Sequence, residues 1–571
     1  MRIKIIRLII FLLLFIVAVD LIYIQVIKGP IYYKQSVNNR IRVIPLEAPR
    51  GIIKDRNGVV LADNRLSFNV AIIPQDIKKR DELFDFLSEV LKEDKTRILR
   101  RFWQKKIAPF APVVVAEDVE KKKAMILEEN KFRFPGLYIQ ESFKRHYPFK
   151  QNISHVLGYV GKINSSEIER LKDYGYTRQS IIGKSGIEEY YDKYLKGDEG
   201  GLQIEVNNKG QQMQLLSLRE PVKGEDIVLT IDYRMQEQAF KALGEKKGSI
   251  IIMDRQTGEI LAMVSKPSFD PNVFTDSKLN NMRSRLFTDP DSPLLNRAIQ
   301  GLYPPGSVFK LILSVAGLAT KKITEYSTFV CPGFYRLGSR RFRCSHTHGQ
   351  QNLFEGISHS CNVYFYNVGL ELGPDLINKY ARLFGLGSLT FIDLPAEEKG
   401  LIPSRMQRKI KSNRGWYKGD TLNYSIGQGD ILITPIQIVR MVATIARKGN
   451  EVQPHLIDSI GSQRMVKLSA VKNVRLKEEI FDVVQTGMRL AVTDSSGTAR
   501  LLNRNGLVIA GKTGTAQSSP SKPHHAWFVG YNKQGQTKVA FCIFLEHGGS
   551  SYNAVVIAKD LFQKLKDENV F

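Results

Sequence analysis

An apolar run at the N-terminus constrains this chain more than any other feature. Residues 8–27 form a stretch of 20 residues in which Asp20 is the only charged side chain. Twenty residues in a helix span roughly 30 Å, the thickness of the hydrocarbon core of a bilayer. Arg2, Lys4 and Arg7 precede the run, and a cationic flank stays on the cytoplasmic side. Residues 1–7 are therefore predicted to be a cytoplasmic tail and residues 8–27 a transmembrane anchor.

The anchor is expected to stay on the protein, because no small-residue cleavage site follows the run. Asp20 is explained most simply by a span that starts nearer Ile3, which leaves the carboxylate at the outer interface. A contact between Asp20 and a membrane helix of a partner is the alternative.

The rest of the chain is expected outside the cytoplasm, because no second apolar run of about 18 residues follows the first. Lys and Arg together number 83 and Asp and Glu 57, which gives a net charge of +26. Such an excess attracts anionic partners. An extracytoplasmic location excludes nucleic acid and leaves an acidic membrane surface or an acidic polymer as the anionic partner. The hydrophobic fraction of 43% is that of a globular protein and excludes a disordered or polytopic chain.

The pattern of predicted elements indicates an α+β fold with two domains beyond the anchor. Residues 28–245 are mixed: a strand, a turn and a strand over 50–62, charged helical character over 80–133, a helix to about Leu195, and a helix capped by Asp232. We expect this part to be an elongated, non-catalytic pedestal domain. Residues 246–571 predict a hairpin (249–254 and 260–265), a buried helix (307–319), two β-rich runs (526–531 and 538–545) and a helix (554–565). This order predicts a domain with an antiparallel sheet flanked by helices.

Ser307 and Lys310 form the first element with chemical meaning. They stand at i and i+3 at the start of the predicted buried helix, so they share one helical face. A serine hydroxyl needs a base to become a nucleophile, and burial favours the neutral amine of a lysine. The pair alone is weak evidence, because S-x-x-K occurs by chance in many chains.

Two further motifs make the pattern specific. Ser360-Cys361-Asn362 supplies a hydroxyl for proton relay and an amide for holding a peptide carbonyl. Lys512-Thr513-Gly514-Thr515 supplies a cation, two hydroxyls and a glycine that lets the backbone approach a ligand. The order S-x-x-K, S-x-N, K-T-G is the motif set of penicillin-binding proteins and β-lactamases.

The chain resembles the class B penicillin-binding proteins from about Arg40 to its end. The resemblance includes the motifs at 50–62 and 183–188 in the pedestal, 424–429 with Thr434-Pro435, 525–530, and 545–549. The elongation-specific members, the penicillin-binding protein 2 group, are the most similar, and the division-specific members are a close second. The resemblance implies a serine D,D-transpeptidase that cross-links peptidoglycan stem peptides and is acylated by β-lactams.

The resemblance also implies roles for the motif residues. Ser307 would be the nucleophile, Lys310 the general base, and Ser360 with Lys512 the proton relay to the leaving amine. Asn362 would hold the substrate backbone. The remaining residues of the last motif, Thr513, Gly514 and Thr515, would bind the substrate carboxylate, and the N–H groups of Ser307 and Thr515 would form the oxyanion hole.

The expected location is the cytoplasmic (inner) membrane, with a single pass and a periplasmic catalytic domain. The resemblance implies a membrane glycosyltransferase of the shape, elongation, division and sporulation family and other elongation-complex proteins as partners. A division-specific transpeptidase, a D,D-carboxypeptidase and a non-catalytic penicillin sensor or scaffold are the alternatives. No cofactor is required for the chemistry.

Three cysteines gather near the second motif. Cys331, Cys344 and Cys361 lie within about thirty residues, with His346 and His348 between them. Three Cys and one His are a suitable set for tetrahedral zinc, and His348 is the better-placed histidine. Some elongation-type members carry zinc near this motif. A structural zinc site, a Cys331–Cys344 disulfide and buried thiols all remain open.

Overall fold

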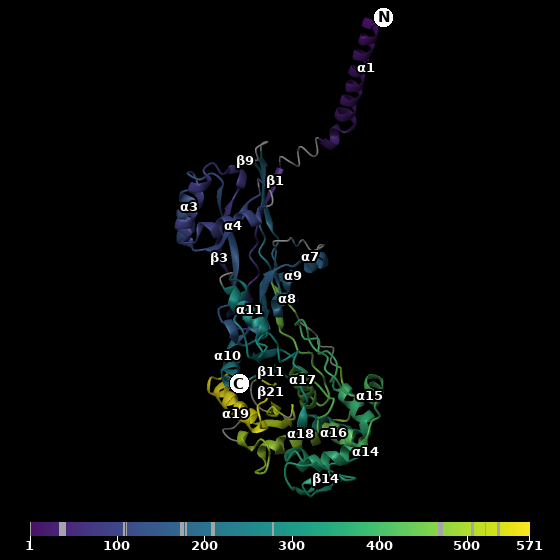
Figure 1. Ribbon diagram of the computed structural model, residues 1–571. Coiled ribbons are helices and arrows are strands. Elements are labelled where there is room, and N and C mark those ends of the chain that lie inside the picture. The colour runs from purple at the N-terminus through teal and green to yellow at the C-terminus, as the bar shows by residue number, and fades with distance from the viewer. Residues whose placement is uncertain are drawn as a thin grey trace. The chain divides into compact units, whose positions relative to one another are not determined.

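The computed structural model describes residues 2–32, 41–106, 109, 111–171, 176, 180–206, 212–276, 279–465, 472–503, 508–519, 521–533 and 537–570. The chain divides into two compact units. The first unit comprises residues 1–51, 64–144 and 196–224, and the second comprises residues 52–63, 145–195 and 225–571. Figure 1 labels their elements.

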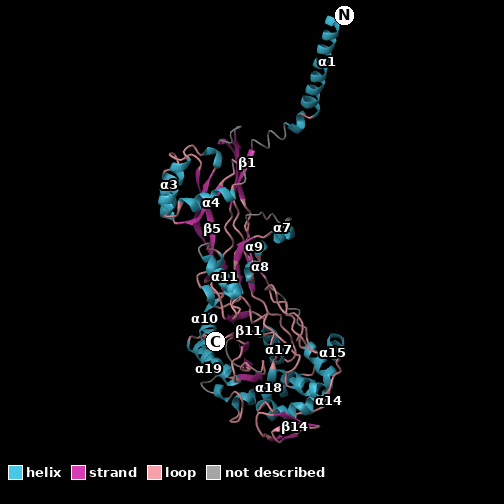
Figure 2. Cartoon of the chain, in the orientation of Figure 1, coloured by secondary structure: helices cyan, strands magenta, loops and turns pink. Residues whose placement is uncertain are grey.

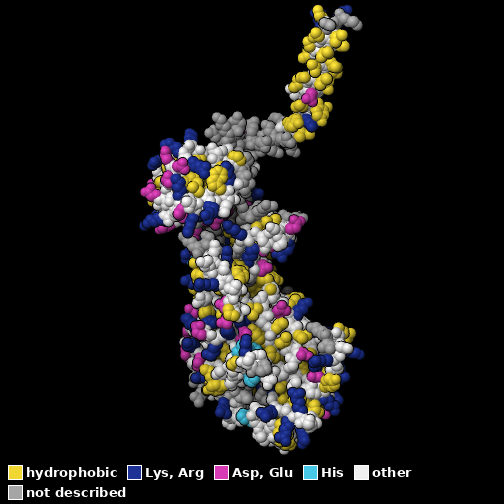
Figure 3. Space-filling view, in the orientation of Figure 1, with side chains coloured by type: hydrophobic (Ala, Val, Ile, Leu, Met, Phe, Trp, Pro, Cys, Tyr) yellow, Lys and Arg dark blue, Asp and Glu magenta, His cyan; other side chains and the backbone are white. Residues whose placement is uncertain are grey.

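The predicted N-terminal apolar helix is confirmed. It consists of α1 (Arg2–Ile22), which continues as the π-helix η1 (Tyr23–Ile27). Within Ile3–Ile27 the most apolar 18-residue window has a mean hydropathy of 3.0, and none of that window is buried. It is the one helix among the described residues that is long and apolar enough to cross a membrane. In Figure 3 its surface is almost wholly hydrophobic.

The first unit has a small core between strands and helices. The antiparallel strands β3 (Val60–Ile72) and β4 (Val113–Val119) pack against α3 (Arg80–Leu91) and α4 (Lys95–Lys105). Residues 80–133 were expected to be helical, and β4 interrupts them because consecutive β-branched valines favour extended backbone. The other elements are α5 (Lys121–Glu129), β5 (Leu137–His146) and a three-stranded sheet of β1 (Ile41–Leu46), β8 (Gly200–Val206) and β9 (Gln212–Arg219).

The second unit is built on the predicted antiparallel sheet. Its strand order is β12-β11-β21-β20-β19, and all four pairings are antiparallel. The predicted hairpin and the two predicted β-rich runs are four of these strands. The bounds are β11 (Gly248–Asp254), β12 (Ile260–Lys266), β19 (Ile509–Ala516), β20 (His525–Asn532) and β21 (Val539–Leu545).

Helices cover both faces of this sheet, because alternate strand residues point to opposite sides. Ile250 and Ile252 face the core that contains α10 (Tyr233–Leu243) and α19 (Ser551–Asp567). Ile251 and Met253 face the larger core that contains α12 (Lys310–Ala319) and α17 (Pro435–Ala446). Asp232 caps α10 as expected, accepting a hydrogen bond from the Arg234 amide.

The helix expected up to Leu195 is in fact two short helices, α8 (Gly186–Tyr190) and α9 (Asp192–Leu195), with Tyr191 between them. The Tyr191 hydroxyl donates to the buried carboxylate of Asp393 over 2.9 Å. This tertiary hydrogen bond stabilises the interruption between α8 and α9.

Figure 2 shows that the second unit also contains several helices joined by loops. The remaining helices are α6 (Ser154–Leu157), α7 (Ser165–Leu171), α11 (Asn280–Thr288), α13 (Leu353–Ser358), α14 (Asn362–Leu383), α15 (Arg405–Ser412), α16 (Lys418–Ser425) and α18 (Glu478–Thr493). The remaining strands are β2 (Ile53–Lys54), β6 (Val160–Lys162), β7 (Ile181–Gly183), β10 (Ile227–Leu229), β13 (Phe329–Cys331), β14 (Phe334–Leu337), β15 (Arg340–Arg343), β16 (Gly349–Gln351), β17 (Ile457–Ile460) and β18 (Gln463–Arg464).

Candidate active site

Ser307 lies in a tight turn that leads into the buried helix. The turn is the 3-10 helix η7 (Gly306–Phe309), and α12 begins at Lys310. Residues i and i+3 of a 3-10 helix eclipse one another, so Ser307 and Lys310 lie on the same side. Ser307 is half-buried, whereas Lys310 has no exposed surface. A substrate can therefore reach the hydroxyl but not the amine.

The Lys310 amine is joined to the second motif. Its Nζ donates to the Ser360 carbonyl and to Asn362 Oδ1, both over 2.7 Å, and to Ser360 Oγ over 3.3 Å. Ser360 has a left-handed φ of 58°, which turns the chain just before α14 starts at Asn362. This turn aims the Ser360 carbonyl and the Asn362 side chain at one amine. The first two motifs thus form one hydrogen-bonded group.

The third motif lies on β19, an edge strand of the sheet. Lys512 is fully buried and its Nζ donates to the Thr513 carbonyl over 3.2 Å. Thr513 and Gly514 are buried, and Thr515 is exposed. The motif therefore places an amine inside the protein and a hydroxyl on its surface.

Close backbone approaches bring η7 against β19. Gly306 has a φ of +54°, and a Cβ on it would lie 2.6 Å from the Thr515 carbonyl oxygen. On its other side, the Gly306 amide donates to the Gly427 carbonyl over 3.0 Å. A side chain at Gly306 would push these segments apart, so the glycine keeps Thr515 beside the turn that carries Ser307.

Burial shifts the pKa of both lysines downward. Desolvation lowers the pKa of Lys310 to about 8. Desolvation and the positive charge of Lys310 hold the pKa of Lys512 well below its usual value. Both amines are thereby biased toward the neutral form, in which an amine has a lone pair that accepts a proton.

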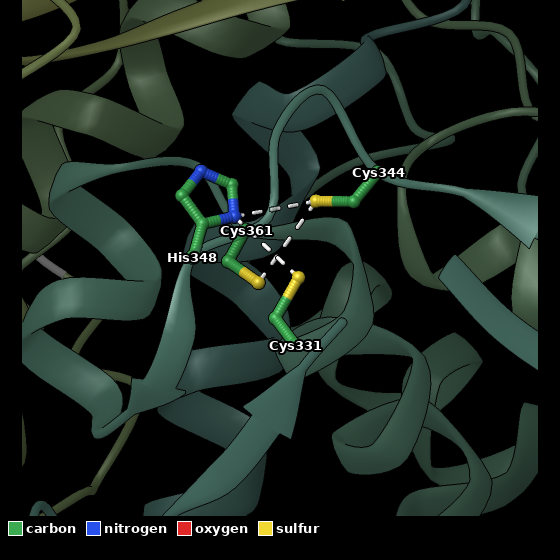
Figure 4. A group of neighbouring side chains, drawn as sticks. All are labelled: Cys331, Cys344, His348 and Cys361. Carbon is green, nitrogen blue, oxygen red and sulfur yellow. Dashed lines mark hydrogen bonds between the residues drawn. The ribbon is translucent and has the colours of Figure 1, made fainter. Parts of the chain in front are cut away.

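The predicted metal ligands converge beside the hydrogen-bonded group of the first two motifs (Figure 4). One donor atom from each of Cys331, Cys344, His348 and Cys361 lies within 4.8 Å of the others. His348 Nδ1 is 3.6 Å from the Cys331 sulfur and 3.5 Å from the Cys344 sulfur. All four cysteines of the chain are free thiols, so the structure contains no Cys331–Cys344 disulfide. Three sulfurs and one nitrogen facing a common point suit a tetrahedral zinc ion, since Zn–S bonds are about 2.3 Å long.

The sulfur cluster is bonded directly to the second motif. The Asn362 amide donates to Cys344 Sγ over 3.1 Å, and the Tyr364 amide donates to Cys361 Sγ over 3.4 Å. The hydrogen bond between the Cys344 and Cys361 sulfurs, together with bonds from backbone amides, lowers the pKa of Cys344. A thiolate is the form that binds metal.

Two contacts of the site were not anticipated from the sequence. The Trp527 indole donates to the Pro304 carbonyl over 3.1 Å, and the Arg343 carbonyl accepts from Asn362 Nδ2 over 3.2 Å. The position of Arg343 beside Cys344 was the available signal for the second contact. The first contact joins residues more than 200 positions apart and has no local signal.

Comparison with known families identifies two matched regions. Residues 248–566 match the penicillin binding protein transpeptidase domain. Residues 45–229 match the penicillin-binding protein dimerisation domain.

Individual relatives match along most of the chain. The peptidoglycan D,D-transpeptidase MrdA of Acinetobacter baumannii is 33% identical over 95% of this chain and 84% of that protein. The structure of penicillin-binding protein 2 with MreC from Helicobacter pylori has a TM-score of 0.84 at 30% identity, covering 93% of this chain and 99% of that chain. A peptidoglycan synthase complex that coordinates polymerization and crosslinking contains a chain with a TM-score of 0.75 at 32% identity, covering 98% of this chain and 97% of that one.

Proposed function

Since the chain belongs to the class B penicillin-binding proteins and is a peptidoglycan D,D-transpeptidase of the elongation type, we propose that Ser307 is its nucleophile. The contact of Lys310 Nζ with Ser360 Oγ and Asn362 Oδ1, one turn from Ser307, carries this assignment. It joins the proposed base, Lys310, to the proposed relay hydroxyl and to the side chain proposed to hold the substrate within one partly buried group.

The reaction follows from this arrangement. Neutral Lys310 takes the proton of Ser307 as Oγ attacks the penultimate D-Ala carbonyl of a stem peptide. The amides of Ser307 and Thr515 stabilise the oxyanion. The proton passes through Ser360 to the leaving D-Ala amine, with Lys512 supporting the transfer. An amine of a second stem peptide then attacks the ester and regenerates Ser307.

Substrate contacts come from the same motifs. The side-chain amide of Asn362 holds the peptide backbone. Lys512, Thr513 and Thr515 bind the terminal carboxylate, and Gly514 permits its close approach. β-Lactams present a carboxylate and a reactive carbonyl in the same relation, and they acylate Ser307.

The decisive experiment supplies the full chain in detergent with uncross-linked glycan oligomers that bear pentapeptide stems. Released D-Ala and cross-linked dimers are both counted. Equal amounts of the two products are expected from the wild type and neither from Ser307→Ala. D-Ala without dimers would instead identify a carboxypeptidase.

The cysteine cluster is proposed to hold a structural zinc ion through Cys331, Cys344, His348 and Cys361. The donor set supports this assignment, because three thiolates and an imidazole fill a tetrahedron and leave no position for a water molecule. The ion would fix the turn from Ser360 to Asn362 through the Cys344 and Cys361 contacts. No step of the reaction needs it.

The membrane arrangement is proposed as a tail at residues 1–7, an anchor at 8–27, a pedestal at 28–245 and a transpeptidase domain at 246–571. The apolar helix supports a single pass with the catalytic domain outside the cytoplasm. Similarity to a chain of a peptidoglycan synthase complex and to a protein bound to MreC supports a membrane glycosyltransferase and elongation proteins as partners.

A further inference from the structure

A hairpin beside the active site carries an unusual concentration of arginines. We call residues 334–343 the arginine hairpin; it consists of β14 and β15. Its register pairs Arg336 with Arg341 and Phe334 with Arg343. Paired residues share a face and alternate residues along a strand share a face, so Arg336, Arg341 and Arg343 lie on one side. All three are exposed.

The opposite face of the arginine hairpin attaches it to the protein. The rings of Tyr335 and Phe342 lie 6.2 and 6.0 Å from the ring of Tyr366 on α14. Phe342 is buried. The apolar face is thus occupied, and the arginine face is directed away from the core. The Arg341 guanidinium lies over the Phe334 ring at 4.9 Å, which holds it against the hairpin.

Among the described residues, no ion pair neutralises the arginine face. Residues 326–354 contain four arginines and no Asp or Glu. Within the described part of the chain, the ion pairs involve none of Arg336, Arg341 and Arg343. Arg336 and Arg341 stand directly opposite each other, and like charges in that relation repel. A bound anion would remove this repulsion. In Figure 3, Lys and Arg side chains gather over the end of the second unit where Figure 1 labels β14.

The arginine hairpin is also joined to the catalytic group. The Arg343 carbonyl accepts from Asn362 Nδ2, and Asn362 Oδ1 in turn accepts from Lys310 Nζ. Arg343, one of the three residues of this face, therefore adjoins the residue proposed to hold the substrate. Stem peptides carry free carboxylates besides the one at the D-Ala terminus, and guanidinium groups bind carboxylates with two parallel hydrogen bonds.

We propose that Arg336, Arg341 and Arg343 form a binding site for stem-peptide carboxylates outside the catalytic motifs. This inference rests on the proposed function, because it takes the peptidoglycan strand as the substrate. The site would recruit acidic stems to the cleft without taking part in acyl transfer.

The test measures binding of soluble glycan oligomers with pentapeptide stems to the full chain in detergent, in a Ser307→Ala background that prevents turnover. In one set of oligomers the stem carboxylates other than the one at the D-Ala terminus are free. In the other set these carboxylates are amidated. R336Q/R341Q/R343Q is compared with R464Q/K564Q/K566Q, which removes three exposed cations from elsewhere in the same unit. The hairpin variant should bind the free-carboxylate oligomers about tenfold more weakly and the amidated ones unchanged. The control should match the parent.

Equal affinity of parent and hairpin variant for the free-carboxylate oligomers would overturn the proposal. The proposal would also be overturned if the hairpin variant lost affinity only for vesicles of phosphatidylglycerol, because the ligand would then be a lipid headgroup. R336K/R341K/R343K should recover part of the affinity, since it restores charge but not the paired hydrogen bonds.

Penicillin acylation of the hairpin variant with Ser307 intact should stay within about twofold of the wild type, since a small β-lactam does not reach the arginine face. If the acylation rate falls further, the binding measurement is repeated with R336Q alone, because Arg336 is not next to Cys344 in the chain. An unchanged affinity of R336Q would then contradict the site. Failure of the proposed function itself would appear separately, as a wild type that penicillin does not acylate.

Discussion

Lys310 Nζ donates a 2.7 Å hydrogen bond to Asn362 Oδ1, and the lysine that does so has no exposed surface. The bond joins the first residue of α12 to the first residue of α14. It holds the amine within hydrogen-bonding distance of Ser360 Oγ, one turn after Ser307. The burial of Lys310, the proposed base, and its bond to the Asn362 side chain, proposed to hold the substrate, are thus one structural feature.

Replacing Lys310 by methionine should abolish efficient acylation while keeping the fold. Methionine fills a similar volume in the buried position but cannot accept a proton. The second-order rate of labelling by a fluorescent penicillin should fall roughly 10²–10⁴-fold, the usual contribution of a general base. Lys322→Met, at an exposed position after α12, is the matched control and should label at the wild-type rate. Fast labelling of Lys310→Met would assign the base elsewhere.

Acylation should depend on pH through Lys310. The pKa of Lys310 is lowered to about 8 by burial, and only the neutral amine acts as a base. The acylation rate should therefore rise about tenfold per pH unit below 8 and level off above it. Stability should also rise with pH from about 8 towards the usual lysine value, since the unfolded state binds the extra proton in that window. A rate that is flat between pH 6 and 9 would contradict this assignment.

Gly306→Ala should separate the active-site segments. The new Cβ would lie 2.6 Å from the Thr515 carbonyl oxygen, in a left-handed backbone conformation that alanine disfavours. Gly338→Ala is the control, because its φ is +59° and no atom lies within 4 Å of its Cβ. The control should cost about 1 kcal/mol of unfolding free energy. Gly306→Ala should cost more and slow penicillin acylation, and equal behaviour of the two variants would show that the close approach is unimportant.

If zinc stabilises the second motif, removal of one zinc ligand should change the metal content and the stability of the protein together. Cys344→Ser should lower both the zinc content of the purified protein and its melting temperature, because a ligand and the Sγ acceptor of the Asn362 amide are lost together. Cys542→Ser is the control; this buried thiol lies on β21, outside the cluster. Full stability of a zinc-free wild type would refute the structural role.

Local patterns predicted the parts of the site that depend on local sequence. The spacing of Ser307 and Lys310 places them on one side because a helical turn does so by itself. The sheet and its hairpin followed from β-rich runs and from the turn at residues 256–259. The contact of Gly306 with Gly427 and the bond from Trp527 to Pro304 did not, because they join segments distant in the chain. Likewise, β4 was missed since charged neighbours on both sides conceal three valines.

The cysteine cluster illustrates the same limit. Its residue types suggested zinc, but the separation of Cys331, Cys344 and Cys361 along the chain also allowed a Cys331–Cys344 disulfide or buried thiols. The fold resolves the geometry, because β13 and the start of α14 bring the sulfurs together with His348.

The most direct test of the account is the intact mass of the full chain after incubation with penicillin. The wild type should gain the mass of one penicillin, and peptide mapping should place the adduct on Ser307. Ser307→Ala should gain nothing while keeping the wild-type melting temperature. An adduct on Ser307→Ala, or a wild-type adduct on any other residue, would contradict the assignment of Ser307 as the nucleophile.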